Sequence, residues 1–80
     1  MTATHHRYAI PAELEPRLIL RSDSGAEAWG LWSGGTFRGR IERPGTPLPG
    51  RPPWGLYGAD GTLLQRDTHP RVFPYHRLGV

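Results

Sequence analysis

Residues 29–37 read WGLWSGGTF and residues 54–63 read WGLYGADGTL, so that one phrase occurs twice, 25 positions apart. In each copy an aromatic segment leads into a glycine-containing turn, and a second apolar segment follows the turn. This order is typical of a β-hairpin. Two such hairpins in tandem predict a small antiparallel sheet, and the repeated phrase therefore decides the fold.

The segments around the two hairpins complete the sheet. Apolar runs and alternating patterns predict strands at 17–21, 26–32, 36–43, 54–58 and 62–67. No stretch carries the long apolar period of 3.6 residues that a helix would show. We therefore predict a mainly β fold, a meander of about five antiparallel strands on two tandem hairpins. At most one short helical turn is expected near the N-terminus, at 11–15, where Pro11 suits the first helical position and Pro16 ends the turn.

Strand 36–43 has the cleanest alternation of apolar and charged residues, which predicts one buried face and one solvated face. Gly39 within the strand indicates a bulge or a close neighbour such as Trp29 or Trp54. The residues expected to face inward are Phe37, Gly39 and Ile41, and those expected in solvent are Arg38, Arg40 and Glu42.

The chain reads as one small domain, 1–80, with a loose lead-in at 1–10. Residues 44–53 hold five prolines and two glycines, which predicts an extended connector loop between the hairpins. The same loop resembles a ligand for proline-recognition modules, although a rigid connector is the simpler interpretation. The stretch 71–78 is either an edge strand interrupted by Pro74 or a tail packed across the sheet.

The charge is carried by ten arginines, with no lysine, and it is uneven. Residues 1–35 hold three arginines against four acidic residues, a net of −1, and residues 36–80 hold seven against three, a net of +4. A basic half predicts a partner with an acidic surface. The total of +3 is modest for a dedicated nucleic-acid binder.

Composition also predicts where the protein works and in what state. Without cysteine there is no disulfide framework and no thiolate metal site. No apolar run is long enough to span a membrane, and the first ten residues lack the apolar core of a secretory signal, so a cytoplasmic protein is expected. A domain this small has a thin core, and a monomer or a homodimer is expected.

Catalysis and cofactor binding are not expected. The sequence shows no nucleophile beside a base, no carboxylate pair on a scaffold and no glycine-rich turn that opens a helix. We therefore predict a non-enzymatic protein with no cofactor and no metal. His5 and His6 are either native or a tag remnant. The four histidines, which lack metal-ligand spacing, are His5, His6, His69 and His76.

The candidate site is a stripe of arginines on strand 36–43. Arg38 and Arg40 would lie about 7 Å apart on one face, a spacing that suits successive phosphates or carboxylates. The alternative is a solvated face paired with acidic neighbours such as Glu42. The aromatic residues of the repeat either fill the core, which is the simpler interpretation, or form an exposed platform. The predicted contact residues are Arg38, Arg40, Arg43, Arg51, Arg66, Trp54 and Tyr57.

Two classes of binding protein fit these features. The first is a small inhibitor or adaptor that covers a site on a larger protein, because Arg, Trp and Tyr are enriched in interface hot spots. The second is a small β module that binds nucleic acid directly, with arginines on phosphates and aromatic rings under bases.

The chain is short, has no cysteine and contains predicted hairpin segments at 36–42 and 54–67. In these features it resembles the small anti-CRISPR proteins of phages and prophages of GC-rich proteobacteria, including those aimed at type I systems, type I-C among them. The resemblance implies a stoichiometric inhibitor that docks on an effector complex such as Cascade and hinders target-DNA capture in the host cell. Many such inhibitors are acidic DNA mimics. Because this chain is basic, contact with an acidic protein surface or an RNA backbone fits better.

Overall fold

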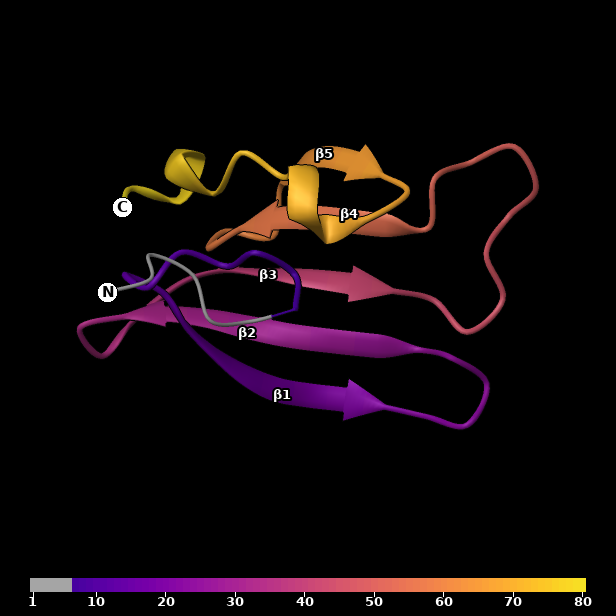
Figure 1. The fold of residues 1–80 in the computed structure, drawn as a ribbon, viewed down its shortest axis with the longest axis horizontal. Helices are drawn as coiled ribbons and strands as arrows, with labels where there is room; N and C mark the ends of the chain where they lie inside the picture. Colours follow the sequence, from indigo (N-terminus) through magenta and orange to yellow (C-terminus); the bar gives the residue numbers. More distant parts are fainter. Residues whose placement is uncertain (1–6) are drawn as a thin grey trace.

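Five strands form one open antiparallel sheet in the order β1-β2-β3-β4-β5 in the computed structural model, which describes residues 7–80 (Figure 1). Each strand pairs with its neighbours in sequence, so the predicted mainly β meander on two tandem hairpins is confirmed. No helix within residues 7–80 is long and apolar enough to cross a membrane. The strands are β1 (Glu15–Arg21), β2 (Glu27–Ser33), β3 (Thr36–Arg43), β4 (Trp54–Gly58) and β5 (Leu63–Asp67).

Glycines in left-handed conformations close both hairpins. Gly34 and Gly35 join β2 to β3 with φ of 57° and 84°. Two positive φ angles in a two-residue loop match a type I′ turn, whose twist suits the flanking strands. Between β4 and β5 the left-handed residue is Gly61, with φ of 86°, and the Asp60 carboxylate accepts a 3.0 Å hydrogen bond from the Thr62 N–H.

The two copies of the repeated phrase have the same alternation in the sheet. Successive strand residues point to opposite faces, so the first and third positions share one face and the second and fourth share the other. The third positions, Leu31 and Leu56, are fully buried. We call the side that they occupy the inner face and the opposite side the outer face.

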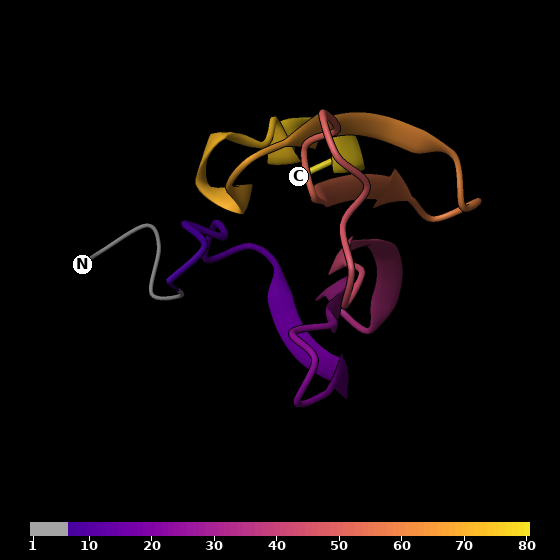
Figure 2. The same cartoon turned by 90° about the vertical axis from the view of Figure 1, so that its right-hand side faces the viewer.

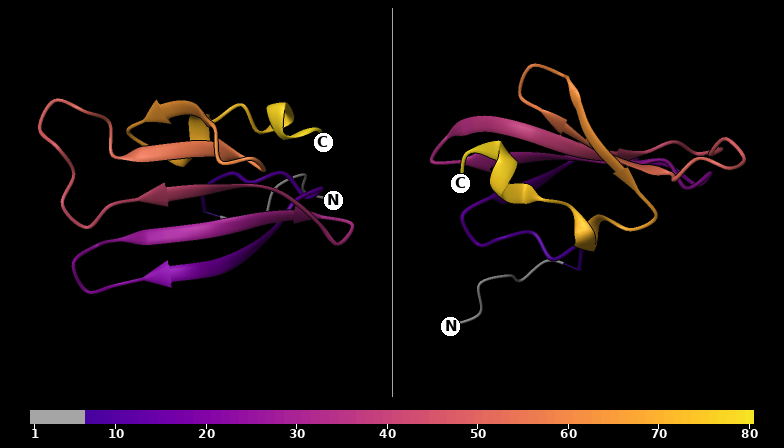
Figure 3. Two further views of the ribbon diagram at one scale, coloured as in Figure 1. Left: turned by 180° about the vertical axis from the view of Figure 1, so that it is seen from behind. Right: turned by 90° about the horizontal axis from the view of Figure 1, so that it is seen from above.

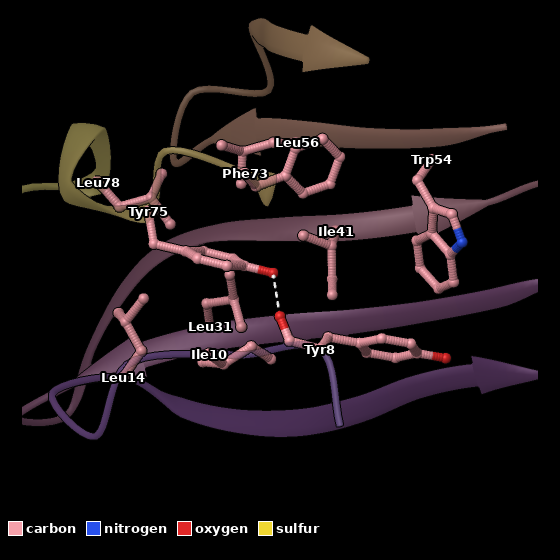
Figure 4. Packing of buried hydrophobic residues seen from close by; sticks show 10 residues of the cluster. All are labelled: Tyr8, Ile10, Leu14, Leu31, Ile41, Trp54, Leu56, Phe73, Tyr75 and Leu78. Carbon is pink, nitrogen blue, oxygen red and sulfur yellow. Dashed lines mark hydrogen bonds between the residues drawn. The ribbon is translucent and has the colours of Figure 1, made fainter. Parts of the chain in front are cut away.

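Both ends of the described chain fold across the inner face. Figure 2 shows the sheet curved around the N-terminal stretch, and Figure 3 shows both terminal stretches on the same side of the strands. The ten-residue core takes four side chains from the sheet and six from the terminal stretches (Figure 4). The sheet supplies Leu31, Ile41, Trp54 and Leu56, and the terminal stretches supply Tyr8, Ile10, Leu14, Phe73, Tyr75 and Leu78.

One buried side chain joins the two ends. The Tyr75 hydroxyl donates its hydrogen to two carbonyl oxygens, that of Pro70 at 3.0 Å and that of Tyr8 at 3.3 Å. Figure 4 shows the bond to Tyr8. Tyr8 and Tyr75 are 67 positions apart in the sequence. Burial raises the pKa of the Tyr75 hydroxyl, which therefore stays protonated as a donor.

The N-terminal predictions are wrong in two respects. The loose lead-in at 1–10 includes Tyr8, 7% exposed, and Ile10, fully buried, so this stretch belongs to the core from Tyr8 onward. Residues 1–6, with His5 and His6, lie outside the described residues. The helical turn expected at 11–15 is instead an isolated, non-helical turn, closed by a 3.0 Å hydrogen bond from Leu14 N–H to the Pro11 carbonyl. β1 begins at Glu15 and accommodates Pro16, because an edge strand tolerates a missing N–H.

The short helical turns lie at the other end of the chain. The open alternatives for 71–78 resolve to a tail packed across the sheet, with two 3-10 turns, η1 (Pro70–Val72) and η2 (Tyr75–Leu78). Pro70 suits the start of a helical turn, since its fixed φ fits and its missing N–H is not needed there. Pro74 precedes η2 and would interrupt a sheet ladder at that position.

The inward orientation predicted for Phe37 is wrong because β3 carries a bulge. Leu31 pairs with Gly39, whereas Trp32 pairs with Phe37, which leaves Arg38 as the extra residue. A bulge of one residue shifts the alternation, so Phe37 joins Trp32 on the outer face, with ring centroids 5.3 Å apart. Gly39 does have close neighbours, but they are the backbone carbonyl oxygen of Tyr57, which lies nearest to where a Cβ would be, and the Leu78 side chain, 2.9 Å from that position.

We expect Tyr75→Phe to lower the free energy of unfolding by about 1–3 kcal/mol, because it removes the donor from two buried carbonyls. Urea denaturation followed by circular dichroism measures the difference. Tyr57→Phe is the matched control, since Tyr57 is only half-buried and packs on the outer face. Equal effects of the two substitutions would contradict the role assigned to Tyr75.

Candidate functional site

The outer face is the side of the sheet that the terminal stretches leave uncovered (Figure 3). It carries arginines and aromatic rings in alternation across the strands. Two arginine–aromatic units stand out, and each is built on a glycine of the repeated phrase. The first consists of Arg17, Gly30 and Trp32, and the second of Arg40, Gly55 and Tyr57.

In the first unit the Arg17 guanidinium carbon lies 4.7 Å from the centroid of the Trp32 ring. Arg17 on β1 pairs across the sheet with Gly30 on β2, two residues before Trp32 on the same face. A Cβ at Gly30 would lie 3.2 Å from Trp32 Nε1, so the missing side chain makes room for the ring. Cation–π contact of this kind holds the guanidinium over the ring, and the Glu15 carboxylate also accepts from Arg17 Nε at 3.2 Å and from Nη2 at 3.3 Å.

The second unit repeats the arrangement on the next pair of strands. The Arg40 guanidinium carbon lies 4.4 Å from the centroid of the Tyr57 ring, and the two residues pair directly across β3 and β4. A Cβ at Gly55 would lie 2.8 Å from Tyr57 Cε1. Arg40 Nε also donates a 2.7 Å hydrogen bond to the Glu42 carboxylate. The Arg40 side chain is therefore held in one orientation by two neighbours.

A groove runs from the outer face onto the proline-rich loop. A first hollow of about 300 Å³ is lined by Leu20, Ala28 and Tyr57 on the strands and by Pro44 and Pro53 at the start and end of the loop. A second hollow of about 180 Å³ lies among the prolines of the loop. Both hollows are lined by Pro44, Pro53 and Arg66, so they adjoin at these residues, and we call them together the groove.

Five of the seven predicted contact residues gather at the second unit and the groove. Arg40 stacks on Tyr57, which also lines the first hollow. Arg43 lines the first hollow, Arg51 lines the second, and Arg66 lines both. The loop connector at 44–53 therefore contributes wall residues as well as linking the hairpins.

The other two predicted contact residues lie elsewhere. Trp54 is 6% exposed in the core, and its ring centroid lies 5.0 Å from that of Tyr8. Arg38 is the bulged residue, with a buried Nε that has no hydrogen-bond partner among residues 7–80, and its Nη1 lies 3.3 Å from where a Cβ of Gly79 would be. The expected stripe is thus divided, because the bulge sends Arg38 toward the C-terminal tail and leaves Arg40 on the outer face.

Sequence reasoning missed Arg17, Leu20 and the proline walls of the groove. Arg17 comes opposite Gly30 only through the β1–β2 register, which the local pattern of β1 does not indicate. One signal was present in both copies of the repeat, namely a glycine two positions before an aromatic residue. That spacing places the two residues on the same face of a strand.

Glu27 lines the first hollow, and its carboxylate takes part in several hydrogen bonds. Its carboxylate, 12% exposed, accepts from Trp29 Nε1 at 2.6 Å, from the Tyr8 hydroxyl at 2.7 Å and from Arg7 Nη2 at 3.1 Å. Burial alone raises the pKa of Glu27. The hydrogen bonds to the carboxylate lower the pKa by more than burial raises it, so the net shift is downward. Glu27 is therefore an ion already engaged within the protein.

The charge left over at the groove is positive. Glu27 has Arg7 as an ion-pair partner, and Glu42 has Arg40. Arg43 Nη1 donates to the carbonyls of Gly25 and Pro44, at 2.9 and 3.0 Å, and not to a carboxylate. Within residues 7–80 the arginines at the groove that have no carboxylate partner are Arg43, Arg51 and Arg66.

The chain matches no protein-family model, no curated protein sequence and no solved structure. A function for this chain must therefore be inferred from the chemistry of its own surface. That surface offers oriented cations, aromatic rings and proline rings, all of which are binding groups. No three His, Asp or Glu side chains gather as a metal-binding group in the part of the chain that the structure describes.

We expect Glu27→Gln to destabilise the protein by about 1–3 kcal/mol at neutral pH, because it removes the charge from several hydrogen bonds. The pKa of Glu27 in the folded state lies below the ordinary value of 4.5. The stability contributed by the charged carboxylate is therefore fully present above pH 4.5 and is lost as the pH falls through the folded-state pKa. Urea denaturation across this pH range measures it. The wild-type advantage should shrink on acidification, and an advantage constant with pH would contradict the assignment. Glu13→Gln, at an exposed turn residue, is the control.

We expect Gly55→Ala to move the Tyr57 ring away from its position under Arg40, because the new Cβ would overlap the ring. Nuclear magnetic resonance measures this through the ring-current shifts of the Arg40 side-chain protons, which should decrease. Gly58→Ala is the matched control on the same strand, since its Cβ would meet Asp60 and not the ring. Unchanged Arg40 shifts in Gly55→Ala would show that glycine does not seat the ring.

Proposed function

We propose that this protein is a non-enzymatic inhibitor that docks its outer face on an acidic surface of a larger protein or ribonucleoprotein. In its specific form, the proposal is an anti-CRISPR protein that binds a Cascade-type effector complex of a type I system and blocks target-DNA binding in the host cytoplasm. The observation that carries the docking proposal is the Arg40–Tyr57 unit beside a groove whose remaining charge is positive.

Preorganisation supports a protein partner. Arg40 is held by Glu42 and by the Tyr57 ring before any partner arrives. An oriented side chain loses less conformational entropy on binding, and arginine and tyrosine are frequent hot-spot residues. The guanidinium also presents a planar fork that matches a carboxylate.

Direct nucleic-acid binding is the second candidate, and one observation favours it. The outer face places Trp32 and Phe37 edge to face, next to Arg17, so that aromatic rings and a cation lie together, as they do in proteins that bind single strands. A base that stacked on Trp32 or on Tyr57 would first have to displace the arginine already over the ring. For that reason the protein partner ranks first.

The anti-CRISPR form rests on the resemblance in size and character, together with a net charge of +3 that disfavours DNA mimicry. Its test is the DNA-binding activity of a purified type I effector complex, measured by gel shift with increasing amounts of the protein. We expect target-DNA binding to be lost at stoichiometric protein. Unchanged DNA binding by type I effectors, type I-C included, at excess protein would reject this form. A gel shift with DNA or RNA and no effector, weakened strongly between about 50 and 200 mM salt, would favour the second candidate.

We expect the double reversal Arg17→Glu with Arg40→Glu to weaken docking on the effector at least about tenfold, because it replaces both oriented cations with like charges for an acidic surface. Titration calorimetry with the purified effector measures the affinity. Arg71→Glu with Arg77→Glu is the control, since it makes the same charge change on exposed residues of the C-terminal turns. If both double variants weakened docking equally, the loss of affinity would reflect net charge alone, and this result would contradict the outer-face site.

A further inference from the structure

We propose that the groove binds an extended acidic peptide segment of the partner protein. The inference rests on the proposed docking function and assigns a ligand class to one part of the docking surface. It is argued from the shape of the groove, its unpaired charge and the hydrogen-bonding chemistry of its walls.

The shape suits an extended chain. The first hollow lies on the sheet beside Tyr57 and the second lies among the prolines of the loop, and Arg66 lines both. A ligand that fills both must be elongated, with one end on the outer face and the other on the loop. Leu20 and Leu48, each at least half exposed, give apolar contact at the two ends.

The charge suits carboxylates on that chain. The acidic residues at the groove, Glu27 and Glu42, are each paired with an arginine of this protein. Arg51 and Arg66 have no carboxylate partner within residues 7–80. An acidic segment would supply the missing counter-charges, as hydrogen-bonded arginine–carboxylate pairs.

The walls favour a peptide over a nucleic acid. Proline has a carbonyl acceptor but no N–H donor, so Pro44, Pro47, Pro52 and Pro53 bring no backbone donor to the groove. The Pro44 carbonyl already accepts from Arg43 Nη1. The N–H groups of an extended peptide can donate to the proline carbonyls. A phosphate backbone has only acceptor oxygens, which cannot form hydrogen bonds with carbonyl oxygens. Prolines also fix the loop before binding, which lowers the entropic cost of association.

The experiment is a titration of the isotope-labelled chain by nuclear magnetic resonance with a short capped peptide of alternating Glu and Val. The matched peptide of alternating Gln and Val and a single-stranded oligothymidylate are titrated in parallel. We expect the Glu peptide to shift the signals of Tyr57, Arg66 and Leu48 and the Gln peptide to bind at least about fivefold more weakly.

Variants test the same contact from the protein side. We expect Arg66→Gln to weaken the Glu peptide about two- to fivefold, and Arg51→Gln with Arg66→Gln about tenfold. Arg71→Gln is the matched control, an exposed arginine on η1 that makes the same charge change as the single variant. The dispersion of the amide signals shows whether each variant is folded. If a variant does not fold, the comparison of the Glu and Gln peptides on the unmodified protein still tests the inference.

Four results would overturn the inference: no shifts in the groove at millimolar Glu peptide, equal binding of the Gln peptide, shifts centred outside the groove, or tighter binding of oligothymidylate at the same residues.

Failure of this site is distinguishable from failure of the proposed function. If the Arg51/Arg66 double variant still docks on the effector with full affinity, the outer face binds the partner without the groove. If the groove binds the Glu peptide but no effector is captured, the groove stands and the inhibitor proposal fails.

Discussion

The burial of one sheet face by both ends of the described chain is the constraint on which the rest of this structure depends. A domain of this size buries only about 60–65% of its unfolded surface, so the sheet alone cannot form a sufficient core. Tyr8, Ile10 and Tyr75 supply the missing apolar surface, and the Tyr75 hydroxyl satisfies carbonyls that this packing takes out of water. The same packing decides which face of the sheet stays open to a partner.

The repeated phrase serves both faces at once. Leu31 and Leu56 fill the core, while each aromatic residue that follows them folds onto a glycine of the outer face. Because the pleat alternates, one short sequence can build a buried layer and an exposed arginine–aromatic unit. The core and the binding surface are consequently coupled through two strands.

Intramolecular pairing shapes the electrostatics of the candidate site. Glu27 and Glu42 are engaged with arginines of the same chain, so they add little attraction for a basic ligand. Arg43, Arg51 and Arg66 are left to define the charge of the groove. A modest net charge of +3 thus includes a localised group of arginines without carboxylate partners, and under the proposed function the location of this charge matters more than its total.

The sequence by itself determined the two hairpins, the five-strand meander and the burial of Ile41, because turn glycines and alternation are local properties of the chain. It also indicated most of the arginines that gather at the groove. The orientations of Phe37, Arg38 and Trp54 were decided only by the tertiary structure. A bulge depends on cross-strand register, and the place of an aromatic ring depends on which distant segment packs over it. Tyr8 shows the same limit, since no local period marks a side chain whose partners lie far along the chain.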